Sequence, residues 1–488
     1  MTEELRRVSA AFRATLPPGL ATSMFSIDGF DRTGVPVVQA NIFNPSEPCT
    51  TGHGYGATAD EAEVGAWGEL CEEFHIGAWL KRTPELFATR AELVGKHGER
   101  GVIDPLTLCL PAGSAYSDEM RLSWVTARRH GDDAPVLVPR EWVAAYPYML
   151  DTPARLITPI TNGLGAGFDM PHAVAHGIME LLQRDGNVLT YRALDRGVVV
   201  DIDVDPGPEV TTLLDHLRTL GITPTVKLAC TDFGISNLYV VGDDHGIPLM
   251  PIQVTACGEA SHPDRARALR KALLEFCGSR ARKAATHAPL PIMREYLPRD
   301  LYDSEMAGAS QKEETRAVEA MAEWLTQPLS VLRERLAETV FSERSRVRLS
   351  ELPDSGPTGN SSDRLALLAA RLATENLDVV YVDCSPPGNA VSVVKTIVPG
   401  LECETMSYHR IGWRGVRRLR ERGDRLIHDA PAPGAERVRL RPEDEVLAGG
   451  PAWFDSAAAD VIVGALYPLY RESSAFAAQL LLERRAAR

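Results

Sequence analysis

The sequence lacks several features that would place it in a common protein class. Its eight cysteines include no Cys-x-x-Cys pair, a scatter that fits reduced, mostly buried thiols better than a disulfide framework or a zinc knuckle. No apolar run approaches the ~18 residues that a membrane-spanning helix needs. Positive charge is in deficit, since 52 Lys and Arg face 66 Asp and Glu. This balance, a net charge of −14, argues against general nucleic-acid binding.

Two signature motifs are also missing. The chain has no Gly-x-x-x-x-Gly-Lys-Ser/Thr loop, which excludes a P-loop as that motif is written, and no Gly-x-Ser-x-Gly nucleophile elbow. The N-terminal residues Met1 to Arg7 include two acids and lead into no apolar core, unlike a secretory signal. These absences predict a cytoplasmic protein that contacts neither a membrane nor nucleic acid.

The composition is that of a folded protein. Of its 488 residues, 44% are hydrophobic and 24% are charged, so the chain is too apolar for a disordered protein and too long for one ordinary core. Sequence periodicity predicts helices over residues 60–81, 171–184, 263–284, 364–374, 413–422 and 475–485, a helix that ends with residues 215–220, and charged helical sequence over 312–345. Strands are predicted over residues 35–40, 122–126, 136–138, 198–204, 236–241, 249–254, 377–383 and 391–398, and a linker over 350–363. Because helices and strands mix without strict alternation, we predict an α+β fold.

The most informative feature is a glycine–carboxylate pattern that occurs twice. Gly52-x-Gly54-x-Gly56 is followed by Ala62, Glu69 and Glu72, and Gly163-x-Gly165-x-Gly167 is followed by Ala173, Glu180 and Gln183. The shift between the copies is constant, because 163 − 52, 173 − 62 and 180 − 69 all equal 111. Gly258, Ala268 and Glu275 repeat the spacings of Gly52, Ala62 and Glu69, which is a fainter third copy.

Each copy has the residue types of a ligand site on a helix. A glycine-rich turn lets the backbone approach a ligand closely, and Glu69 and Glu72, three residues apart, share one helix face. Two helices that present oxygen ligands to one space suit Mg²⁺, which takes its remaining ligands from waters and substrate phosphates. The pattern therefore indicates nucleotide handling. Apolar residues on both sides of each pair argue against the alternative, a pair of solvated surface glutamates.

Two other interpretations of the second copy stay open. The glycines from Gly163 to Gly167 precede a helix as in a dinucleotide-binding loop, but Phe168 stands where the third glycine of that motif belongs and Pro159 weakens the preceding strand. His172, His176 and Glu180 are spaced four residues apart and could hold zinc, although no cysteine or third histidine lies beside them.

Four segments, in order, resemble motifs of the YcaO family. Residues 55–72 resemble its Gly-Lys-Gly-x-Thr … Ser-Ala-x-x-Glu-Ala-x-Glu-Arg segment, and residues 161–185 its Ser-Asn-Gly-Leu-Ala-Ala-Gly … Gly-Leu-x-Glu-Leu-Ile-Glu-Arg-Asp segment. Residues 268–280 resemble Ala-Leu-x-Arg-Ala-Leu-Thr-Glu-x-x-x-Ser-Arg, and residues 391–402 resemble the closing Pro-Val-Val-Arg-x-x-Val-Pro-Gly-Leu-Glu. The order and spacing match across residues 30–405, which makes the resemblance specific.

The resemblance implies a YcaO-like fold of mixed sheets flanked by helices, and an enzyme that uses ATP and Mg²⁺ to activate a peptide backbone amide. In such enzymes a nucleophile adds to the amide carbonyl, ATP phosphorylates the resulting oxyanion, and phosphate leaves. A Cys, Ser or Thr side chain as nucleophile gives an azoline, a backbone amine gives an amidine and external sulfide gives a thioamide. We expect cyclodehydration to an azoline, with amidine or thioamide formation as the alternatives.

The resemblance also implies site residues. The expected Mg²⁺ ligands are three carboxylates: Glu69, Glu72 and Glu180. The expected ATP-binding residues are Asn162, Arg184, Lys271, Glu275 and Arg280. It identifies no catalytic base, and a salt-bridged helix face is the alternative for the last three of these five residues.

Several positions depart from the family pattern. Tyr55 stands where the family has Lys, Gly65 where it has Ser, and Glu73 where it has Arg. His172 falls where an acid is usual, and Gln183 replaces a carboxylate, which removes one negative charge from a cation site. The chain is therefore a divergent member with an altered metal count or ATP geometry, or a degenerate partner that binds peptide without chemistry.

The C-terminus bears on domains and partners. Azoline-forming members of the family commonly end in Pro-x-Pro-x-Pro, whereas this sequence ends Glu-Arg-Arg-Ala-Ala-Arg. We expect a catalytic domain over residues 1–425 and an extension with a terminal helix over 426–488. Expected partners are a precursor peptide, a second copy of the chain and a separate leader-binding protein, since no fused leader-binding domain is evident. A precursor-binding scaffold and, more remotely, a nicotinamide oxidoreductase are the competing functions.

Overall fold

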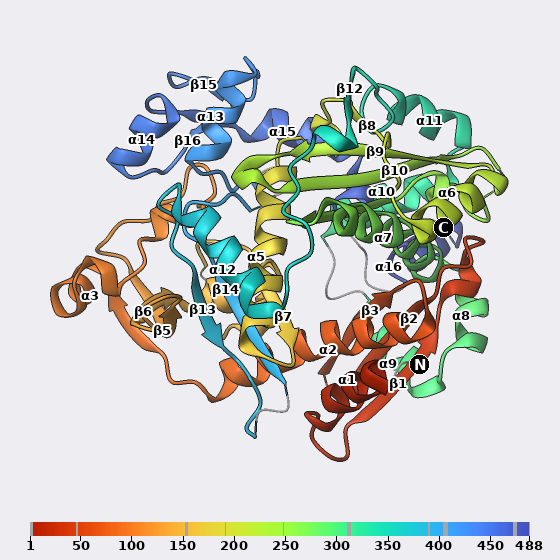
Figure 1. Ribbon diagram of the computed structural model, residues 1–488, viewed down its shortest axis with the longest axis horizontal. Coiled ribbons are helices and arrows are strands. Elements are labelled where there is room, and N and C mark those ends of the chain that lie inside the picture. The colour runs from red at the N-terminus through yellow and green to blue at the C-terminus, as the bar shows by residue number, and fades with distance from the viewer. Residues whose placement is uncertain are drawn as a thin grey trace.

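The computed structural model describes residues 3–44, 47–151, 155–190, 192–246, 248–309, 314–388, 391–403, 408–471 and 476–487. They form the expected α+β structure, and the strands lie in four sheets (Figure 1). The first sheet has the strand order β1 (Ala21–Ser26), β2 (Val37–Asn44), β3 (Glu47–Tyr55). The second has the order β4 (Leu86–Thr89), β5 (Arg121–Arg129), β13 (Val380–Asp383), β14 (Ser392–Ile397), β7 (Leu164–Gly167), with β6 (Pro135–Pro139) beside β5.

The third sheet has the order β11 (Cys257–His262), β10 (Ser236–Asp244), β9 (Ile222–Cys230), β8 (Val198–Asp201), β12 (Ser345–Arg348). The fourth is small, with β15 (Ile427–His428), β17 (Trp453–Asp455) and β16 (Ala435–Arg437). Three helices bear the glycine–carboxylate copies: α2 (Ala59–Arg82), α5 (Met170–Asn187) and α7 (Arg265–Thr286). The other helices up to α9 are α1 (Glu3–Ala14), α3 (Arg90–His97), α4 (Arg140–Val143), α6 (Pro208–Thr219), α8 (Leu290–Tyr296) and α9 (Arg299–Gly308). Those after α9 are α10 (Thr315–Thr326), α11 (Leu329–Ala337), α12 (Ser361–Ala373), α13 (Trp413–Glu421), α14 (Pro442–Ala448), α15 (Ser456–Gly464) and α16 (Ala477–Ala486).

Polar side chains fix the start of each of the three long helices. The Thr58 hydroxyl accepts a hydrogen bond from the backbone N–H of Glu61 in α2, and Asp169 accepts one from His172 in α5. Asp264 accepts two backbone N–H groups at the start of α7. Such caps satisfy helix N–H groups that have no partner within the helix, which explains why the helices begin where they do.

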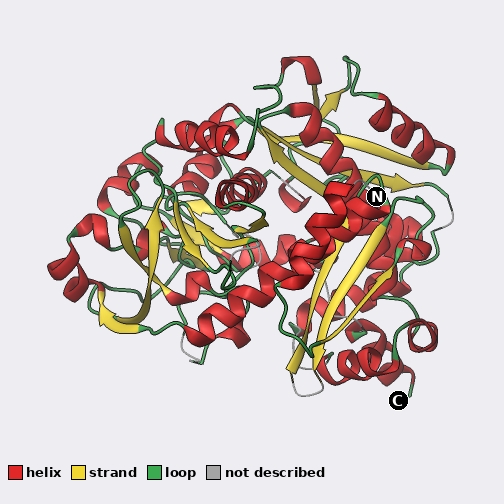
Figure 2. Ribbon diagram, turned by 60° about the horizontal axis from the view of Figure 1, so that its bottom comes forward, coloured by secondary structure: helices red, strands yellow, loops and turns green. Residues whose placement is uncertain are grey.

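These three helices and the three larger sheets alternate around the centre of the molecule. α2 lies against β2 and β3 on one side and against β7 and β14 on the other. α5 lies between β7 and β14 on one side and β9, β10 and β11 on the other, and α7 contacts β10 and β11 as well as β2 and β3. Figure 1 shows α5 in the middle of the molecule, and Figure 2 shows the long α2 helix running beside the three-stranded sheet. The elements thus close a ring in which each helix lies between two sheets.

The glycine pattern is explained by the contact between each helix and the strand before it. A Cβ atom on Gly54 of β3 would collide with the backbone of α2. The same collision would occur between Gly165 of β7 and α5, and between Gly258 of β11 and α7. Each of these strands is the edge strand of its sheet. The three copies, including the faint third one, are therefore the same strand–helix unit, in which glycine allows close backbone approach.

Most predicted elements are present, with two corrections. The strand expected over residues 249–254 is wrong, because Pro251 starts a 3₁₀ turn there and the strand that pairs with β10 is β11 at Cys257–His262. Residues 350–363 are not a free linker. The backbone N–H of Ser355 donates to the Pro263 carbonyl at 2.8 Å, and Arg265 donates to the Leu352 carbonyl at 2.9 Å. This segment therefore packs along the start of α7. Residues 312–313 and Ala475 lie outside the described residues.

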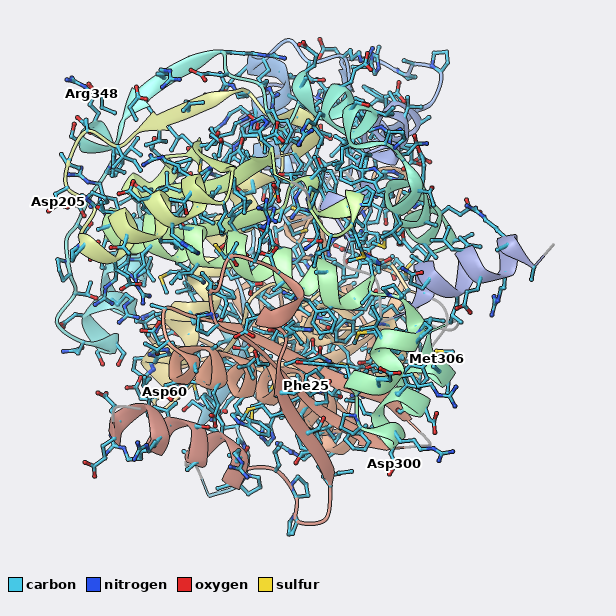
Figure 3. The ribbon with its side chains drawn as sticks, turned by 90° about the vertical axis from the view of Figure 1, so that its right-hand side faces the viewer. Phe25, Asp60, Asp205, Asp300, Met306 and Arg348 are labelled. Carbon is cyan, nitrogen blue, oxygen red and sulfur yellow. The ribbon has the colours of Figure 1, made fainter. Side chains whose placement is uncertain are left out.

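The C-terminal elements share a core with earlier ones. Trp413, Val416 and Leu419 of α13 pack in one apolar cluster with Phe454 of β17 and Val463 of α15. On the other side of the molecule, Phe25 of β1 and Met306 of α9 belong to a second cluster that joins the first sheet to α8 and α9 (Figure 3). No helix within the described ranges has both the length and the apolar content to cross a membrane. The boundary at residue 425 remains a prediction.

A buried histidine at the end of α7 predicts acid sensitivity. His287 is 3% exposed, and burial, with a smaller effect of Lys283, lowers its pKa to about 3. The unfolded chain takes up a proton below about pH 6.5 and the folded chain does not until about pH 3, so stability is lost as the pH falls through that window. We expect His287→Gln to shrink the difference in unfolding free energy between about pH 7.5 and about pH 5 by about 2 kcal/mol, measured by urea unfolding. An unchanged difference would contradict a neutral buried His287.

Candidate active site

The three strand–helix units bring one glutamate each toward a shared space. Glu69 lies on α2, Glu180 on α5 and Glu275 on α7, at equivalent positions in the three copies. β3 lies between α2 and α7, and its Tyr55 hydroxyl donates a hydrogen bond to Glu275 Oε2 at 2.8 Å. The charge of Glu69 also acts on Tyr55, which raises the pKa of that phenol beyond the effect of its burial and of Glu275. The centre of the ring is therefore a carboxylate-lined site.

Backbone N–H groups of the glycine-rich segments orient two of these carboxylates. The N–H of His53 in β3 donates to Glu69 Oε2 at 2.8 Å, and the N–H of Gly163, which precedes β7, donates to Glu180 Oε2 at 3.0 Å. Gly163 has φ +84°, a conformation that other residues rarely adopt. The glycine-rich segments thus fix the side chains that follow 16 and 17 residues later.

Glu72 completes the acidic group between α2 and α5. Burial and the charges of Glu180 and Glu69 raise its pKa well above the usual value, and a backbone hydrogen bond from Ala166 acts in the opposite direction. The negative charges of Glu180 and Glu69 therefore oppose the ionisation of Glu72. Their mutual repulsion is the electrostatic signature of a site that binds positive charge.

Tyr55 fills the place of the lysine expected from the family pattern. A Cβ atom on Gly278 would crowd the Tyr55 ring, so this glycine in α7 makes room for the larger side chain. Burial raises the pKa of Glu275 to about 7; Glu259 adds to the rise, and Lys271, the Tyr55 hydrogen bond and Arg184 oppose it. At this position the phenol gives Glu275 a hydrogen-bond donor that carries no positive charge.

Arg184 links the second and third copies. Its Nη2 lies 3.6 Å from Glu180 Oε1, and its Nη1 donates to Glu259 of β11. Burial alone would lower the pKa of Arg184, but the charges of Glu259, Glu180 and Glu275 outweigh it and hold the pKa above its usual value. Glu259, which Asn187 also contacts, was not expected from sequence. It directly follows Gly258, so the faint third copy was the available signal.

The remaining expected residues fall into different surroundings. Lys271 is exposed one turn before Glu275, and its charge acts on both Glu275 and His176. Asn162 precedes Gly163 and lines a small cavity. Gln183 is buried, at 5% exposure, on the same helix as Glu180. Lys271 and Asn162 are thus placed at the edges of the carboxylate group.

Arg280 corrects the sequence expectation. Its side chain is 0% exposed and donates to Asp31 Oδ1 at 3.0 Å and to Asp244 Oδ2 at 2.8 Å. These two buried ion pairs connect α7 to the turn after β1 and to β10. They occupy the guanidinium group that would otherwise contact ATP. We therefore assign Arg280 to packing rather than to nucleotide contact.

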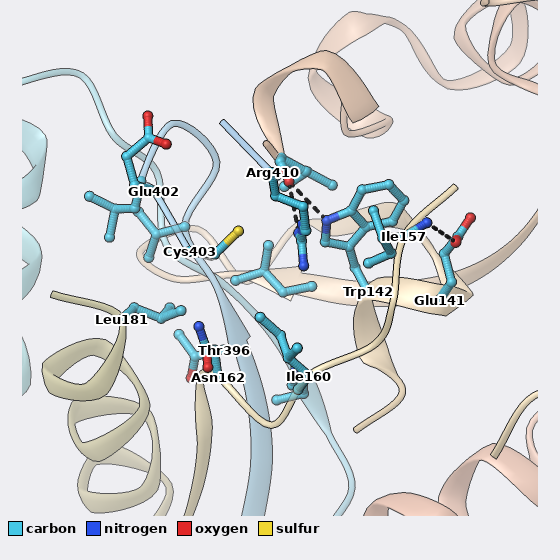
Figure 4. A pocket seen from close by; sticks show the side chains of 15 residues that line it. Glu141, Trp142, Ile157, Ile160, Asn162, Leu181, Thr396, Glu402, Cys403 and Arg410 are labelled. Carbon is cyan, nitrogen blue, oxygen red and sulfur yellow. Dashed lines mark hydrogen bonds between the residues drawn. The ribbon is translucent and has the colours of Figure 1, made fainter. Parts of the chain in front are cut away.

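A cavity of about 50 Å³ adjoins the site on the side of β14 (Figure 4). Asn162 and Leu181, the neighbours of Gly163 and Glu180, form its wall on the carboxylate side. Lys395 of β14 forms another part of the wall, is 3% exposed and donates from Nζ to the Ile160 carbonyl at 2.7 Å. We call this cavity the Lys395 pocket. Lys395 was not expected from the sequence, although it lies inside the closing motif at residues 391–402.

The two other interpretations of the second copy do not hold. β7 is an edge strand antiparallel to β14, whereas a dinucleotide loop follows a parallel strand inside a sheet. Burial, together with the charges of Lys271, His172 and Arg364, lowers the pKa of His176 to about 3. A dication bound there would face the same positive charges, which argues against zinc.

The carboxylates fit Mg²⁺ bound together with a polyphosphate. Across the described ranges, no three His, Cys, Asp or Glu side chains are close enough to form a complete metal cage by themselves. Mg²⁺ seldom needs one, since it is bound by one or two carboxylates and completes its shell with waters and phosphate oxygens. Glu69, Glu72 and Glu180 are oxygen donors that act on one another electrostatically, and they would hold such an ion.

Comparison with known proteins agrees with this geometry. An uncharacterized protein of Methanothermobacter thermautotrophicus is 26% identical over 396 residues, which span 80% of this chain and 92% of that protein. A heterocyclase in complex with substrate and cofactor has the same fold, with a TM-score of 0.62 and 16% identity over 84% of this chain. The match spans only about half, 54%, of the heterocyclase chain. YcaO from Methanopyrus kandleri bound with AMPPCP and Mg²⁺ has a TM-score of 0.57 and 20% identity, and the match covers 84% of this chain and 93% of that chain.

A family model identifies the family to which these similar proteins point. The model described as YcaO cyclodehydratase, ATP- and Mg²⁺-binding, matches residues 53–402, which is well over half of the chain. The match includes α2, α5, α7, β14 and every carboxylate of the site, and ATP and Mg²⁺ are the cofactors that the family binds. The chain belongs to the YcaO family.

Proposed function

We propose that this protein uses ATP and Mg²⁺ to phosphorylate the oxygen of a backbone amide in a ribosomally made precursor peptide. The observation that carries the proposal is the convergence of Glu69, Glu180 and Glu275 from three equivalent units, with Arg184 between two of them. Membership of an ATP- and Mg²⁺-binding family supports the same reading.

The chemistry suits these residues. An amide oxygen is a poor leaving group, and transfer of a phosphoryl group to it makes it a good one. Catalysis of such a transfer consists mainly of positioning and charge neutralisation. The acids Glu69, Glu72 and Glu180 would hold the cation that neutralises the phosphates, and Arg184 and Lys271 would contact the phosphate oxygens.

The product depends on the nucleophile. Attack by a Cys, Ser or Thr side chain gives the azoline expected from sequence, attack by a backbone amine gives an amidine, and attack by an external sulfide gives a thioamide. All three share the phosphorylation of the amide oxygen, so the site described above serves each of them. A precursor peptide is the proposed partner, and delivery by a separate leader-binding protein is part of the proposal.

The test is incubation with ATP, Mg²⁺ and precursor peptides encoded beside the gene, followed by mass spectrometry and a phosphate assay. Loss of one water with release of phosphate is expected for an azoline or an amidine, and replacement of one oxygen by sulfur is expected for a thioamide. No mass change and no phosphate release would contradict the proposal. Calorimetry with AMPPCP and Mg²⁺ tests the scaffold alternative, which predicts no detectable binding.

A further inference from the structure

The charged side chains around the Lys395 pocket are arranged unevenly. Figure 4 shows the sulfur of Cys403 and the guanidinium of Arg410 directed toward the middle of the pocket, whereas the carboxylates of Glu402 and Glu141 point away from it. The Glu402 carboxylate accepts the backbone N–H groups of Gly412 at 2.9 Å and Gly415 at 2.7 Å. The pocket interior is therefore lined by positive charge and a thiol.

Both cations of the pocket are bound only to neutral acceptors. Lys395 donates to the Ile160 carbonyl, and Arg410 donates to the carbonyls of Cys109 at 2.9 Å and Leu108 at 3.0 Å. Within the described part of the chain, neither forms an ion pair with a carboxylate. Lys395 has three N–H donors and Arg410 has five, so both have donors left for a ligand. A buried cation without an ion pair is costly, and an anion in the pocket would remove that cost.

We propose that the Lys395 pocket binds hydrosulfide, the external nucleophile of a thioamide-forming reaction at the adjacent carboxylate site. The inference rests on the proposed function and selects one of its three nucleophiles. A side-chain or backbone nucleophile arrives with the peptide and needs no site of its own. An external nucleophile does need one, and this pocket begins at Asn162 and Leu181, next to the residues that position Glu180.

The size and the lining of the pocket favour a small, polarisable anion of single charge. A volume of about 50 Å³ holds a few water-sized groups. Most of the other lining side chains are apolar, among them Trp142, Ile157 and Ile397. A doubly charged phosphate needs a dense set of N–H donors, which such walls do not provide. Two thiols, Cys384 and Cys403, add sulfur to the surroundings of Lys395.

The reaction balances without a further oxidant or reductant. Hydrosulfide forms a C–S bond to the amide carbon, and the carbonyl electron pair moves to oxygen. That oxygen forms a bond to the γ-phosphorus of ATP, and ADP leaves. The C–O bond then breaks, the sulfur proton is lost, and the products are thioamide, ADP and hydrogen phosphate. Amide, HS⁻ and ATP supply every atom and charge of these products.

Equilibrium dialysis of the full chain with ³⁵S-labelled hydrosulfide, without ATP or peptide, tests the pocket directly. We expect one bound hydrosulfide per chain, and binding about 10- to 100-fold weaker in Lys395→Met, because a charge-assisted hydrogen bond is lost. Lys395→Arg keeps the cation and is expected to bind as the wild type does. Lys283→Met is the matched control, since Lys283 also donates to a backbone carbonyl, that of Thr255, but lies outside the pocket.

The outcomes distinguish a failure of the pocket assignment from a failure of the proposed function. Equal competition by chloride or by inorganic phosphate would overturn the hydrosulfide assignment, as would unchanged binding in Lys395→Met. If Lys395→Met fails to fold, Cys403→Ser replaces it, and undiminished hydrosulfide binding in that variant would count against the thiol-lined pocket. Hydrosulfide binding by a chain that modifies no peptide would support the pocket and contradict the proposed function. Loss of water from the peptide without any sulfide would support the proposed function and contradict the hydrosulfide assignment of the pocket.

Discussion

Glu69→Gln is expected to lower ATP-dependent turnover by about 100- to 1000-fold while leaving the protein folded. The glutamine amide oxygen can still accept the His53 N–H that orients Glu69, so the local geometry should survive. What disappears is the negative charge that the bound cation needs. Steady-state phosphate release over a range of Mg²⁺ concentrations measures the effect, and Glu180→Gln is expected to behave in the same way.

The same substitution should raise stability, which separates a functional role from a structural one. Glu69 and Glu180 raise the pKa of Glu72 by repulsion, so removing one charge relieves the folded state by about 1 kcal/mol. Glu63→Gln is the matched control, because Glu63 lies on the same helix and its described contact is the Ser9 hydroxyl at 2.6 Å. Full activity in both Glu69→Gln and Glu180→Gln would refute the site assignment.

Asp185→Asn is expected to destabilise the protein by about 3–5 kcal/mol, because it leaves the buried Arg414 and the largely buried Arg418 without their main counterion. Asp185 is 1% exposed, and it accepts from Arg414 Nε at 3.0 Å, from Arg418 Nη2 at 2.6 Å and from the Glu402 N–H at 2.9 Å. These contacts join the end of α5, directly after Arg184, to α13. Urea unfolding near neutral pH measures the loss.

A control with the same partners is available for that prediction. Asp232 also pairs with Arg414 at 2.7 Å and Arg418 at 2.6 Å, but its side chain is 36% exposed. Asp232→Asn should therefore lower the unfolding free energy by no more than about 1 kcal/mol, because water can reach this exposed site and solvate the arginines. Equal losses in the two variants would show that burial of Asp185 does not decide the energetics.

Sequence predicted those parts of the molecule that depend on local pattern. The helix over residues 60–81 carries both its cap at Thr58 and its apolar face in its own sequence, and the structure has α2 at Ala59–Arg82. The constant shift of 111 residues corresponds to a strand–helix unit that the structure repeats. Its third copy was faint because only Gly258, Ala268 and Glu275 keep the spacing, although Gly258 meets α7 as Gly52 meets α2.

Sequence failed where the partner of a residue lies far along the chain. Arg280 sits at a family motif position, yet its partners Asp31 and Asp244 lie 249 and 36 residues away, and nothing local indicates that pairing. Arg414 and Asp185 are separated by 229 residues, and Arg414 lies outside the segment that matches the family. The strand at residues 249–254 was mistaken because its apolar content outweighed Pro251 in the prediction.

The central claim is that ATP phosphorylates the oxygen of a peptide amide, and isotope transfer tests it most directly. A precursor peptide labelled with ¹⁸O at the reacting amide is incubated with the protein, ATP and Mg²⁺, and the released phosphate is analysed by mass spectrometry. The account predicts one ¹⁸O atom in the phosphate for each modified peptide, whichever nucleophile attacks. Phosphate without ¹⁸O, accompanied by label in water or retained in the peptide, would contradict it.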